Sequence, residues 1–268
     1  MTTPSATLLV VGATGSIGSL VVAEAVREGY AVRALVRNPD KARELSPGAE
    51  RVVGDLTRPD TLTNAVSGID AVVFTHGTYD ADSKVAERID YGAVRNVLTA
   101  LGSTQVRIAL MTTIGVTSRT GSSQSNNDRH DWKRRGERLV RASRLPYTIV
   151  RPGWFDYNAS DQHRIVMLQG DTRHAGDSTD GVVARSQIAE VLVRSLASDA
   201  AVRKTFELVT ERGKGPDTPE EFDRLFAGLE PDPPGALDGV RDRPNLPLEK
   251  EPERVRADLR NFAPQGVL

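Results

Sequence analysis

The sequence predicts an α/β fold with a doubly wound parallel sheet, and two observations predict it. Short apolar runs alternate with helix-length amphipathic segments over the first half of the chain, and a glycine-rich turn follows the first apolar run. Strands separated by helical segments pair in parallel, because each helix carries the chain back along the sheet. With 268 residues, 38% of them hydrophobic, the chain can cover such a sheet on both faces.

Residues 7–36 carry the most specific part of this pattern. An apolar run at 7–11 leads into Gly12-Ala-Thr-Gly15-Ser-Ile-Gly18, and a helical pattern then leads to a second apolar run at 31–36. This layout matches a dinucleotide-binding βαβ unit, in which the N–H groups of the helix N-terminus face the pyrophosphate. Gly12 permits the turn, Gly15 the approach of the pyrophosphate and Gly18 the close packing of helix on sheet. The expected cofactor contacts are Gly12, Thr14, Gly15, Ser16, Ile17 and Gly18.

Arg37 follows the second strand, where an NAD-specific site usually has an acidic residue for the ribose 2′-hydroxyl. A guanidinium can hold a 2′-phosphate through paired hydrogen bonds. Arg37 therefore predicts NADP(H) as the cofactor. The alternative is that Arg37 and Lys41 are only surface charges.

The alternation continues to about residue 150. Further strands are expected at 50–54, 71–75, 106–111 and 147–150, helices at 60–66, 83–101 and 129–143, and a polar loop at 112–127. These elements define a predicted nucleotide-binding core over residues 1–152. Residues 153–210, with a strand at 165–168, a helix at 187–196 and a strand at 205–209, are expected to complete the sheet and form the substrate side.

Residues 211–268 form a predicted C-terminal extension that holds nine of the fifteen prolines. Thr218-Pro-Glu-Glu221 has the pattern of a capping box and opens an expected helix to Ala227. Residues 231–252 are too rich in proline for regular structure and are expected to wrap over the surface or to stay mobile. The amphipathic stretch 253–262 is expected to dock as a helix on the domain or on a second subunit.

Composition excludes several classes of protein. The net charge is −1 with both signs interspersed, so no basic surface for nucleic acid is expected. There is no cysteine, which excludes disulfides and thiolate chemistry and fits a reducing, cytoplasmic location. No apolar run approaches the ~20 residues of a membrane span. The two histidines His163 and His174 lie among several aspartates without ligand spacing, so no metal site is expected.

Six segments carry a family resemblance: Val11-Gly-Ala-Thr-Gly15-Ser-Ile-Gly18, Leu35-Val-Arg37-Asn-Pro39, Gly54-Asp55-Leu56, Asp90-Tyr-Gly92 with Asn96, Met111-Thr-Thr-Ile-Gly115, and Tyr147-Thr-Ile-Val-Arg-Pro-Gly153. On these residues, the chain resembles the atypical short-chain dehydrogenase/reductases over about residues 6–210. Its segments are most similar to the NmrA-like group with a Rossmann core, which includes NADPH-dependent quinone reductases. The motifs are specific for the superfamily and not for a substrate.

The resemblance implies roles for individual residues. Asp55 and Leu56 would flank the adenine, and Thr75, His76 and Gly77 would pass beside the adenosine ribose and the pyrophosphate. Thr112 and Thr113 stand where relatives carry a serine that orients the substrate carbonyl, and Thr112 is also an expected cofactor contact. Lys133 would contact the nicotinamide ribose, and Pro152 with Gly153 would lie next to the nicotinamide ring.

One position departs from the family pattern. Carbonyl-reducing relatives carry Tyr-x-x-x-Lys, with the phenol as proton donor, whereas Arg129 stands four residues before Lys133. Arginine is too weak an acid to replace it. Lys133, Thr113 and Tyr157 are therefore the predicted catalytic residues, with Tyr157 a possible replacement for the donor.

These residues also have a purely structural alternative. Trp154, Phe155 and Tyr157 then only line the site or the core, and Lys133 forms a solvated ion pair with Glu137. His76 and His130 are further candidates for groups that titrate near neutrality, with a structural role as the alternative.

The predicted function is hydride transfer from NADPH to a small organic acceptor, either a quinone or a carbonyl compound. Quinone reduction needs less from a dedicated phenolic acid and is favoured for that reason. The alternative is a catalytically silent NADP(H)-binding redox sensor of the NmrA-like type. Epimerase or dehydratase chemistry on a nucleotide sugar is a third hypothesis. A small-molecule substrate is the expected partner, and a homodimer is possible.

Overall fold

The sheet of the computed structural model has the predicted doubly wound order. The structure describes residues 6–78, 80, 82–119 and 124–263, without the side chains of residues 41 and 124–127. Within these ranges the strand order is β3-β2-β1-β4-β5-β6-β10-β9-β7, and β8 also pairs with β10. The strands from β3 to β10 in this order run parallel, whereas β8 and β9 run antiparallel to β10. The α/β fold with a largely parallel Rossmann sheet is confirmed.

The strands that make the sheet are as follows: β1 Thr7–Val11, β2 Ala31–Val36, β3 Ala49–Val53, β4 Ala71–Phe74, β5 Arg107–Met111, β6 Tyr147–Pro152, β7 Trp154–Phe155, β8 Arg164–Leu168, β9 Val182–Val183 and β10 Lys204–Glu211. The longer strands lie within three residues of their predicted bounds. The two-residue strands β7 and β9 were not predicted, because two residues are too few to show alternation.

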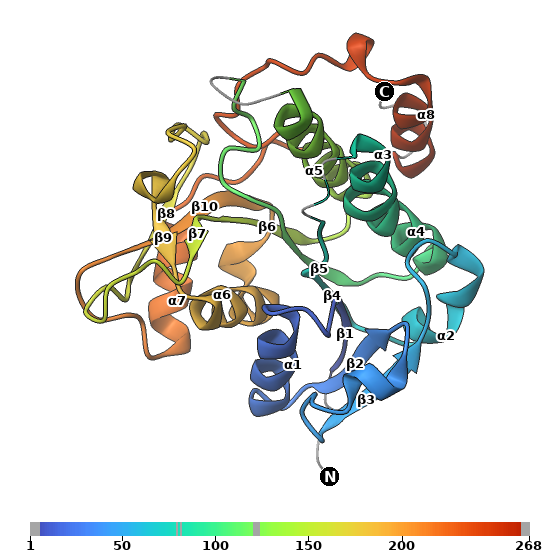
Figure 1. The fold of residues 1–268 in the computed structure, drawn as a ribbon, viewed down its shortest axis with the longest axis horizontal. Coiled ribbons are helices and arrows are strands. Elements are labelled where there is room, and N and C mark those ends of the chain that lie inside the picture. The colour runs from blue at the N-terminus through green and yellow to red at the C-terminus, as the bar shows by residue number, and fades with distance from the viewer. Residues whose placement is uncertain (1–5, 79, 81, 120–123, 264–268) are drawn as a thin grey trace.

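Helices cover both faces of the sheet, as Figure 1 shows. On one face lie α1 (Gly18–Arg27), α6 (Arg185–Ala197) and α7 (Pro219–Ala227). On the other lie α2 (Thr63–Val66), α3 (Ser83–Ala86), α4 (Gly92–Leu101), α5 (Gln124–Ala142) and α8 (Glu253–Phe262). In β1 alternate residues enter the two cores, Leu8 and Val10 on the α1 side and Leu9 and Val11 on the other. A strand buried on both faces reads as a continuous apolar run, which is why the sequence marks β1 clearly.

The helix predicted at 83–101 is interrupted. A π-helical turn, η3 (Glu87–Tyr91), joins α3 to α4, and it buries Asp90 and Tyr91. The helix predicted at 60–66 is likewise split into a 3-10 turn, η2 (Pro59–Thr61), and α2. The predicted loop 112–127 is shorter than expected, because α5 begins at Gln124; residues 120–123 lie outside the described ranges.

The C-terminal extension packs on the domain. The capping box of Thr218 and Glu221 is present at the start of α7, as predicted. From there the chain crosses α5 with only a short 3-10 turn, η6 (Leu248–Lys250), and α8 packs against α5 (Figure 1). Val255 and Leu259 of α8 are fully buried. Of the expected alternatives, the extension wraps over the domain and its helix docks on the same chain.

Candidate functional site

The predicted site residues gather at the carboxyl-terminal edge of the sheet. Four neighbouring strands end there, at Val11, Phe74, Met111 and Pro152. The strand ends are joined by backbone hydrogen bonds from Thr75 N to Val11 O and from Thr112 N to Val150 O, both 2.9 Å long. In open α/β sheets ligands bind at this edge.

The glycine turn has the geometry that its sequence predicts. Gly12 has φ +86°, and a Cβ there would lie 2.7 Å from the backbone N of His76. A Cβ on Gly18 would lie 2.0 Å from Gly12 O. A Cβ on Gly15 would meet only Gly12 O, at 3.2 Å, and the segment 14–16 is exposed. Helix α1 follows with Ile17 as its N-cap and no side-chain cap. Ser19 N donates to Gly15 O, and no side chain caps the helix, so this end fits the pyrophosphate of a dinucleotide.

Arg37 is exposed directly after β2, and its side chain makes no hydrogen bond or ion pair with another residue in the described ranges. It lies near Asp55: hydrogen bonds from Thr57 lower the pKa of that carboxyl, and the charge of Arg37 lowers it further. The guanidinium is therefore available to an anionic ligand beside the predicted adenine site. The side chain of Lys41, the other cation noted in this segment, lies outside what the structure describes.

The segment of Asp55 and Leu56 is fixed by its neighbours. Asp55 Oδ1 accepts hydrogen bonds from the backbone N and the Oγ1 of Thr57, each 2.8 Å long. The backbone carbonyl of Leu56 accepts a 2.7 Å bond from Nδ2 of the buried Asn96. Asn96 thus holds the segment of Leu56 in place. In the sequence, Asn96 was noted as part of a family motif and had no predicted role.

Lys133, Asp90, His76 and Gly77 form one cluster. Lys133 Nζ donates to Asp90 Oδ1 over 2.7 Å, and a Cβ on Gly77 would lie 3.2 Å from Nζ. The Asp90 side chain is 1% exposed, and its Oδ2 has no hydrogen-bond partner within the described structure; the same is true of His76 Nδ1. Lys133 is therefore paired with a buried carboxylate and not with a solvated Glu137. Asp90 was missed as a site residue, although its motif had been noted.

Of the two alternatives for His76 and His130, the pKa values favour a structural role over titration near neutrality. Burial lowers the pKa of both His76 and His130 to about 4. For His130, the charge of Lys133 acts in the same direction. Both rings are therefore neutral at pH 7.

The residues on the acceptor side are differently placed. Thr112 Oγ1 is buried and donates to Glu137 Oε1 over 2.7 Å, whereas Thr113 is half-buried and its hydroxyl makes no hydrogen bond with another described residue. Tyr157 is 68% exposed and Trp154 is 39% exposed, and their rings meet edge to face at 6.3 Å. These two aromatic side chains are therefore not part of the core. Pro152 is buried at the end of β6.

Comparison with known proteins identifies the family. A family model described as NAD(P)H-binding matches residues 12–199. The chain belongs to this NAD(P)H-binding family. A nicotinamide cofactor and a Rossmann-fold relationship to oxidoreductases follow, in agreement with the atypical short-chain dehydrogenase/reductase resemblance.

Proteins that are similar to this chain carry names that indicate different functions. The photosystem II assembly factor Ycf39 of Guillardia theta is 32% identical over 210 residues, 75% of this chain and 64% of that protein. Sanguinarine reductase of Eschscholzia californica is 25% identical over 261 residues, 82% of this chain and 95% of that protein. A putative NAD-dependent epimerase/dehydratase from Bacillus halodurans has the same fold, with a TM-score of 0.69 at 23% identity, covering 84% of this chain and 100% of that one. The chain thus spans less than two-thirds of the length of the Ycf39 proteins.

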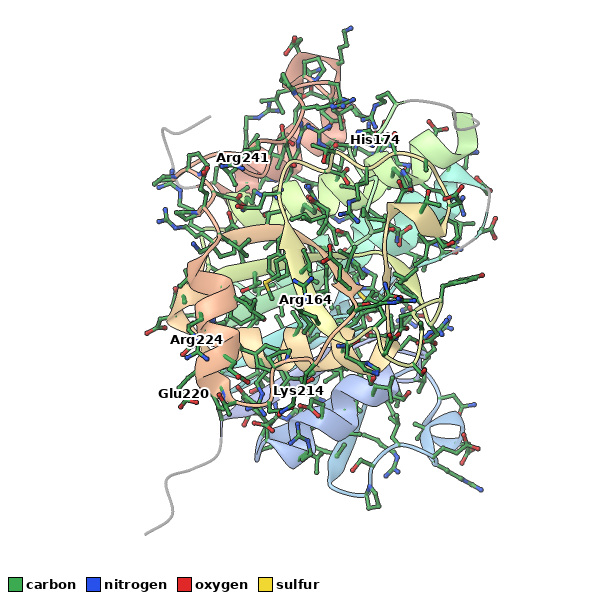
Figure 2. The ribbon with its side chains drawn as sticks, turned by 90° about the vertical axis from the view of Figure 1, so that its left-hand side faces the viewer. Arg164, His174, Lys214, Glu220, Arg224 and Arg241 are labelled. Carbon is green, nitrogen blue, oxygen red and sulfur yellow. The ribbon has the colours of Figure 1, made fainter. Side chains whose placement is uncertain are left out.

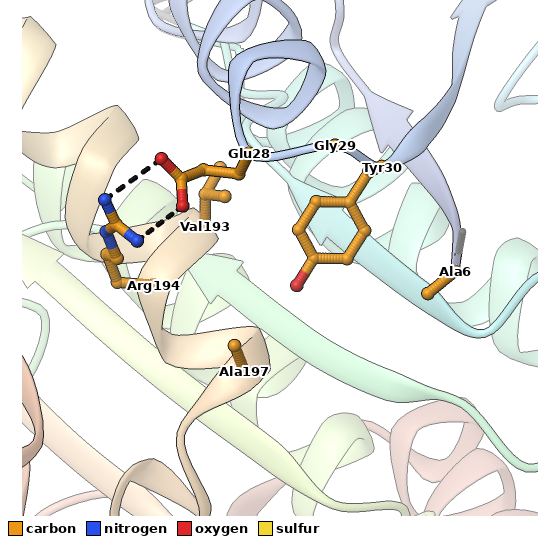
Figure 3. A pocket seen from close by; sticks show the side chains of 7 residues that line it. All are labelled: Ala6, Glu28, Gly29, Tyr30, Val193, Arg194 and Ala197. Atoms are coloured by element: carbon orange, nitrogen blue, oxygen red, sulfur yellow. Dashed lines mark hydrogen bonds and ion pairs between the residues drawn. The ribbon is translucent and has the colours of Figure 1, made fainter. Parts of the chain in front are cut away.

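Two cavities among the described residues lie outside the glycine turn. One of about 280 Å³ is lined by Glu28, Tyr30 and Arg194 among others, at the amino-terminal edge of the sheet (Figure 3). A second of about 200 Å³ adjoins Thr57 and Asn96, next to the predicted adenine segment. In the described ranges no group of three or more His, Asp or Glu side chains could hold a metal ion. None of the helices described there combines the length and apolar composition that a bilayer span requires.

Proposed function

We propose that this protein is an NADP(H)-dependent oxidoreductase that transfers hydride to a small organic acceptor, a quinone or a carbonyl compound. The observation that carries the choice of cofactor is Arg37, an exposed guanidinium with no ion pair to another described residue, placed directly after β2. An acidic residue at this position would bind the ribose hydroxyls of NAD, whereas arginine accommodates the 2′-phosphate of NADP.

Different residues bind different parts of the cofactor. The turn at Gly12, Gly15 and Gly18 and the uncapped end of α1 hold the pyrophosphate, because a helix N-terminus attracts anions. Lys133, fixed by Asp90, binds the nicotinamide ribose, and Pro152 borders the ring. The bound nicotinamide supplies the hydride, and the protein supplies binding, orientation and exclusion of water.

The acceptor lies on the side of Thr113, Trp154 and Tyr157. The Thr113 hydroxyl is available as a hydrogen-bond donor to a developing oxyanion. The exposed edge-to-face pair of Trp154 and Tyr157 offers aromatic surface to a ring-shaped acceptor. With arginine at position 129, no phenol stands one helical turn before Lys133, and a quinone is the acceptor least dependent on one. In this proposal the site contains residues of both the predicted nucleotide-binding core, 1–152, and the predicted substrate side, 153–210.

The similarity to a reductase supports this proposal, since sanguinarine reductase aligns over nearly its full length. The similarity to an assembly factor favours the alternative, a catalytically silent NADP(H)-binding protein. Arg129 in place of the tyrosine is the feature of this chain that favours the alternative. Cytoplasmic location and a homodimer stay predictions.

Calorimetric titration with NADPH, NADP⁺, NADH and NAD⁺ tests the cofactor. The phosphorylated pair should bind more tightly, and Arg37→Ala should reduce that preference about 10- to 100-fold, the effect of losing hydrogen bonds to a charged group. Arg27→Ala, which removes an exposed charge at the far end of α1, is the control and should change nothing. Equal affinity for NADPH and NADH in the unmodified protein would refute the NADP(H) assignment.

Oxidation of bound NADPH by menadione then separates the enzyme from the sensor. For the enzyme, NADPH absorbance falls in a single turnover, and Lys133→Met slows the reaction. For the sensor, NADPH binds but persists.

A further inference from the structure

Part of the C-terminal extension forms ion pairs with buried arginines next to the candidate site. We call this segment, residues 230–251, the tail strap. It crosses five buried arginines, four on α5 and one on β6: Arg134, Arg135, Arg138, Arg141 and Arg151. The core offers them the carboxylate of Glu137 and the buried side chain of Glu207, and the tail strap adds the carboxylates of Asp232, Asp238, Asp242 and Glu251. Buried cations need such partners, because an unpaired charge in the interior is strongly destabilising.

One branch of this network runs from the tail strap to the end of β5. Asp242 accepts two hydrogen bonds from Arg151, each 2.7 Å long. Arg151 also donates to both oxygens of Glu137, over 3.0 and 2.7 Å. Glu137 Oε1 in turn accepts the hydrogen bond of Thr112. All of these side chains are buried, so the position of Asp242 is transmitted to Thr112 through fixed contacts.

A second branch is direct. Asn245 Nδ2 donates to the backbone carbonyl of Thr117 over 2.8 Å, while its Oδ1 accepts from Arg134 Nη1 over 2.6 Å. The guanidinium fixes the orientation of the amide, because it can only donate. Asn245 therefore links the tail strap to the segment 112–118, which we call the acceptor loop because it contains Thr113.

A third branch holds the same loop through Asp171. The buried Asp171 accepts hydrogen bonds from Gly115 N, Thr117 N and Thr117 Oγ1, between 2.6 and 2.8 Å long. Its own backbone N donates to Glu207 Oε2 over 3.0 Å, and Glu207 is paired with Arg151. The acceptor loop is thus clamped between Asp171 and Asn245, and both clamps lead to arginines that the tail strap neutralises.

We propose that the tail strap positions the acceptor side of the site, with Asn245 and Asp242 as positioning residues for the acceptor loop. The proposal rests on the function proposed above. Asn245 makes no contact with the glycine turn, Arg37, or the Lys133–Asp90 pair among the interactions of the described residues. Its loss should therefore weaken the acceptor's binding and leave the cofactor's unchanged.

Asn245→Asp tests this directly. The substitution keeps the size and the oxygen that faces Arg134, and it replaces the donor to Thr117 O by a carboxylate oxygen. The expected result is a KM for menadione raised about tenfold, the effect of one lost buried hydrogen bond, with an unchanged Kd for NADPH. Amide hydrogen exchange in residues 112–118 should become faster while Tm stays close to that of the unmodified protein.

Glu230→Gln is the matched control. Glu230 lies on the same strap and pairs with Arg241 at the surface, where Figure 2 shows Arg241 at the edge of the molecule. This variant should leave KM and exchange unchanged. If Asn245→Asp does not fold, Asp242→Asn replaces it in the same measurements of KM, Kd and exchange. Asp242 is linked to Thr112 through Arg151 and Glu137.

An unchanged KM together with unchanged exchange in the acceptor loop would overturn the proposal. So would a parallel loss of NADPH binding and Tm, because the strap would then only support the fold. If the unmodified protein binds NADPH but reduces no quinone, hydride transfer to a quinone fails as the function, and the exchange of residues 112–118 alone decides whether the strap positions the loop.

Discussion

Lys133 and Asp90 form an ion pair of 2.7 Å that joins α5 to the π-helical turn η3 beneath Gly77. The carboxylate is almost completely buried, whereas the lysine is 18% exposed. The lysine is thus held at one point of the predicted nicotinamide end of the site before any ligand arrives. Preorganisation of this kind reduces the entropy lost on binding.

Asp90→Asn should weaken binding of the nicotinamide half of the cofactor only. The amide keeps the shape of the side chain but no longer attracts the ammonium group, so Lys133 loses its fixed position. We expect the Kd for NADPH to rise about tenfold and the Kd for 2′,5′-ADP, which lacks the nicotinamide ribose, to stay the same. Competition titrations measure both.

Asp199→Asn is the control for that variant, since Asp199 is exposed and pairs with Arg107. It should bind both ligands normally. Equal weakening of NADPH and 2′,5′-ADP by Asp90→Asn would show that Asp90 supports the whole site and not the lysine.

Two glycines of the turn should respond differently to alanine. Gly18→Ala places a Cβ 2.0 Å from Gly12 O, so the turn must move, and we expect a loss of about 3 kcal/mol in the free energy of unfolding. Gly15→Ala meets only one atom, at 3.2 Å, and should leave Tm nearly unchanged. Its methyl group points to the side where the pyrophosphate is expected, so NADPH binding should fall sharply.

Urea unfolding and calorimetry separate these effects. A Gly15→Ala variant that binds NADPH normally would contradict the place assigned to the pyrophosphate. A stable Gly18→Ala variant would contradict the close packing of α1 on the turn.

The strands and the glycine turn could be predicted because their signals are local. β1 is an unbroken apolar run, and the spacing of Gly12, Gly15 and Gly18 has a direct geometric cause. The π-helical turn could not be predicted, because one extra residue in the turn hardly changes the periodicity over 83–101. Its consequence, the burial of Asp90 beside Lys133, was therefore missed as well.

The fixed path of the tail strap was beyond prediction for another reason. The many arginines of α5 are typical of a helix face exposed to solvent, and the many prolines of the tail strap are typical of a mobile segment. The charges of these two segments neutralise each other across more than 90 residues of sequence. Sequence patterns report local periodicity and not such distant pairing.

Glu251 should be a stabilising residue of the extension. Its buried carboxylate accepts hydrogen bonds from Arg135 over 2.6 Å and from Arg138 over 2.7 Å. Glu251→Gln removes the carboxylate that pairs with Arg135 and one of the two that pair with Arg138, and we expect a loss of about 3 kcal/mol in urea unfolding. Glu249→Gln, an exposed neighbour, should cost almost nothing. Equal effects of the two variants would mean that the buried pairs add no stability.

Glu207 should make stability depend on pH. Burial raises the pKa of its carboxyl to about 8, against the opposing effect of Arg151, from an ordinary value of 4.5. Between pH 4.5 and 8 the folded protein therefore holds a proton at Glu207 that the unfolded chain has released. Its contribution to stability is complete below pH 4.5 and is lost as the pH rises through 8, by up to about 1.4 kcal/mol per unit.

In Glu207→Gln the side chain is neutral at every pH, so the variant lacks this contribution to the pH dependence of the free energy of unfolding. The free energy of unfolding of the variant, minus that of the unmodified protein, should rise between pH 4.5 and 8 and then level off. His76 and His130 ionise in both proteins and cancel in the difference. Urea unfolding at half-unit intervals of pH measures it. A difference that is flat or falls with pH would show that Glu207 is ionised in the fold, and that Arg151 and not burial decides its charge.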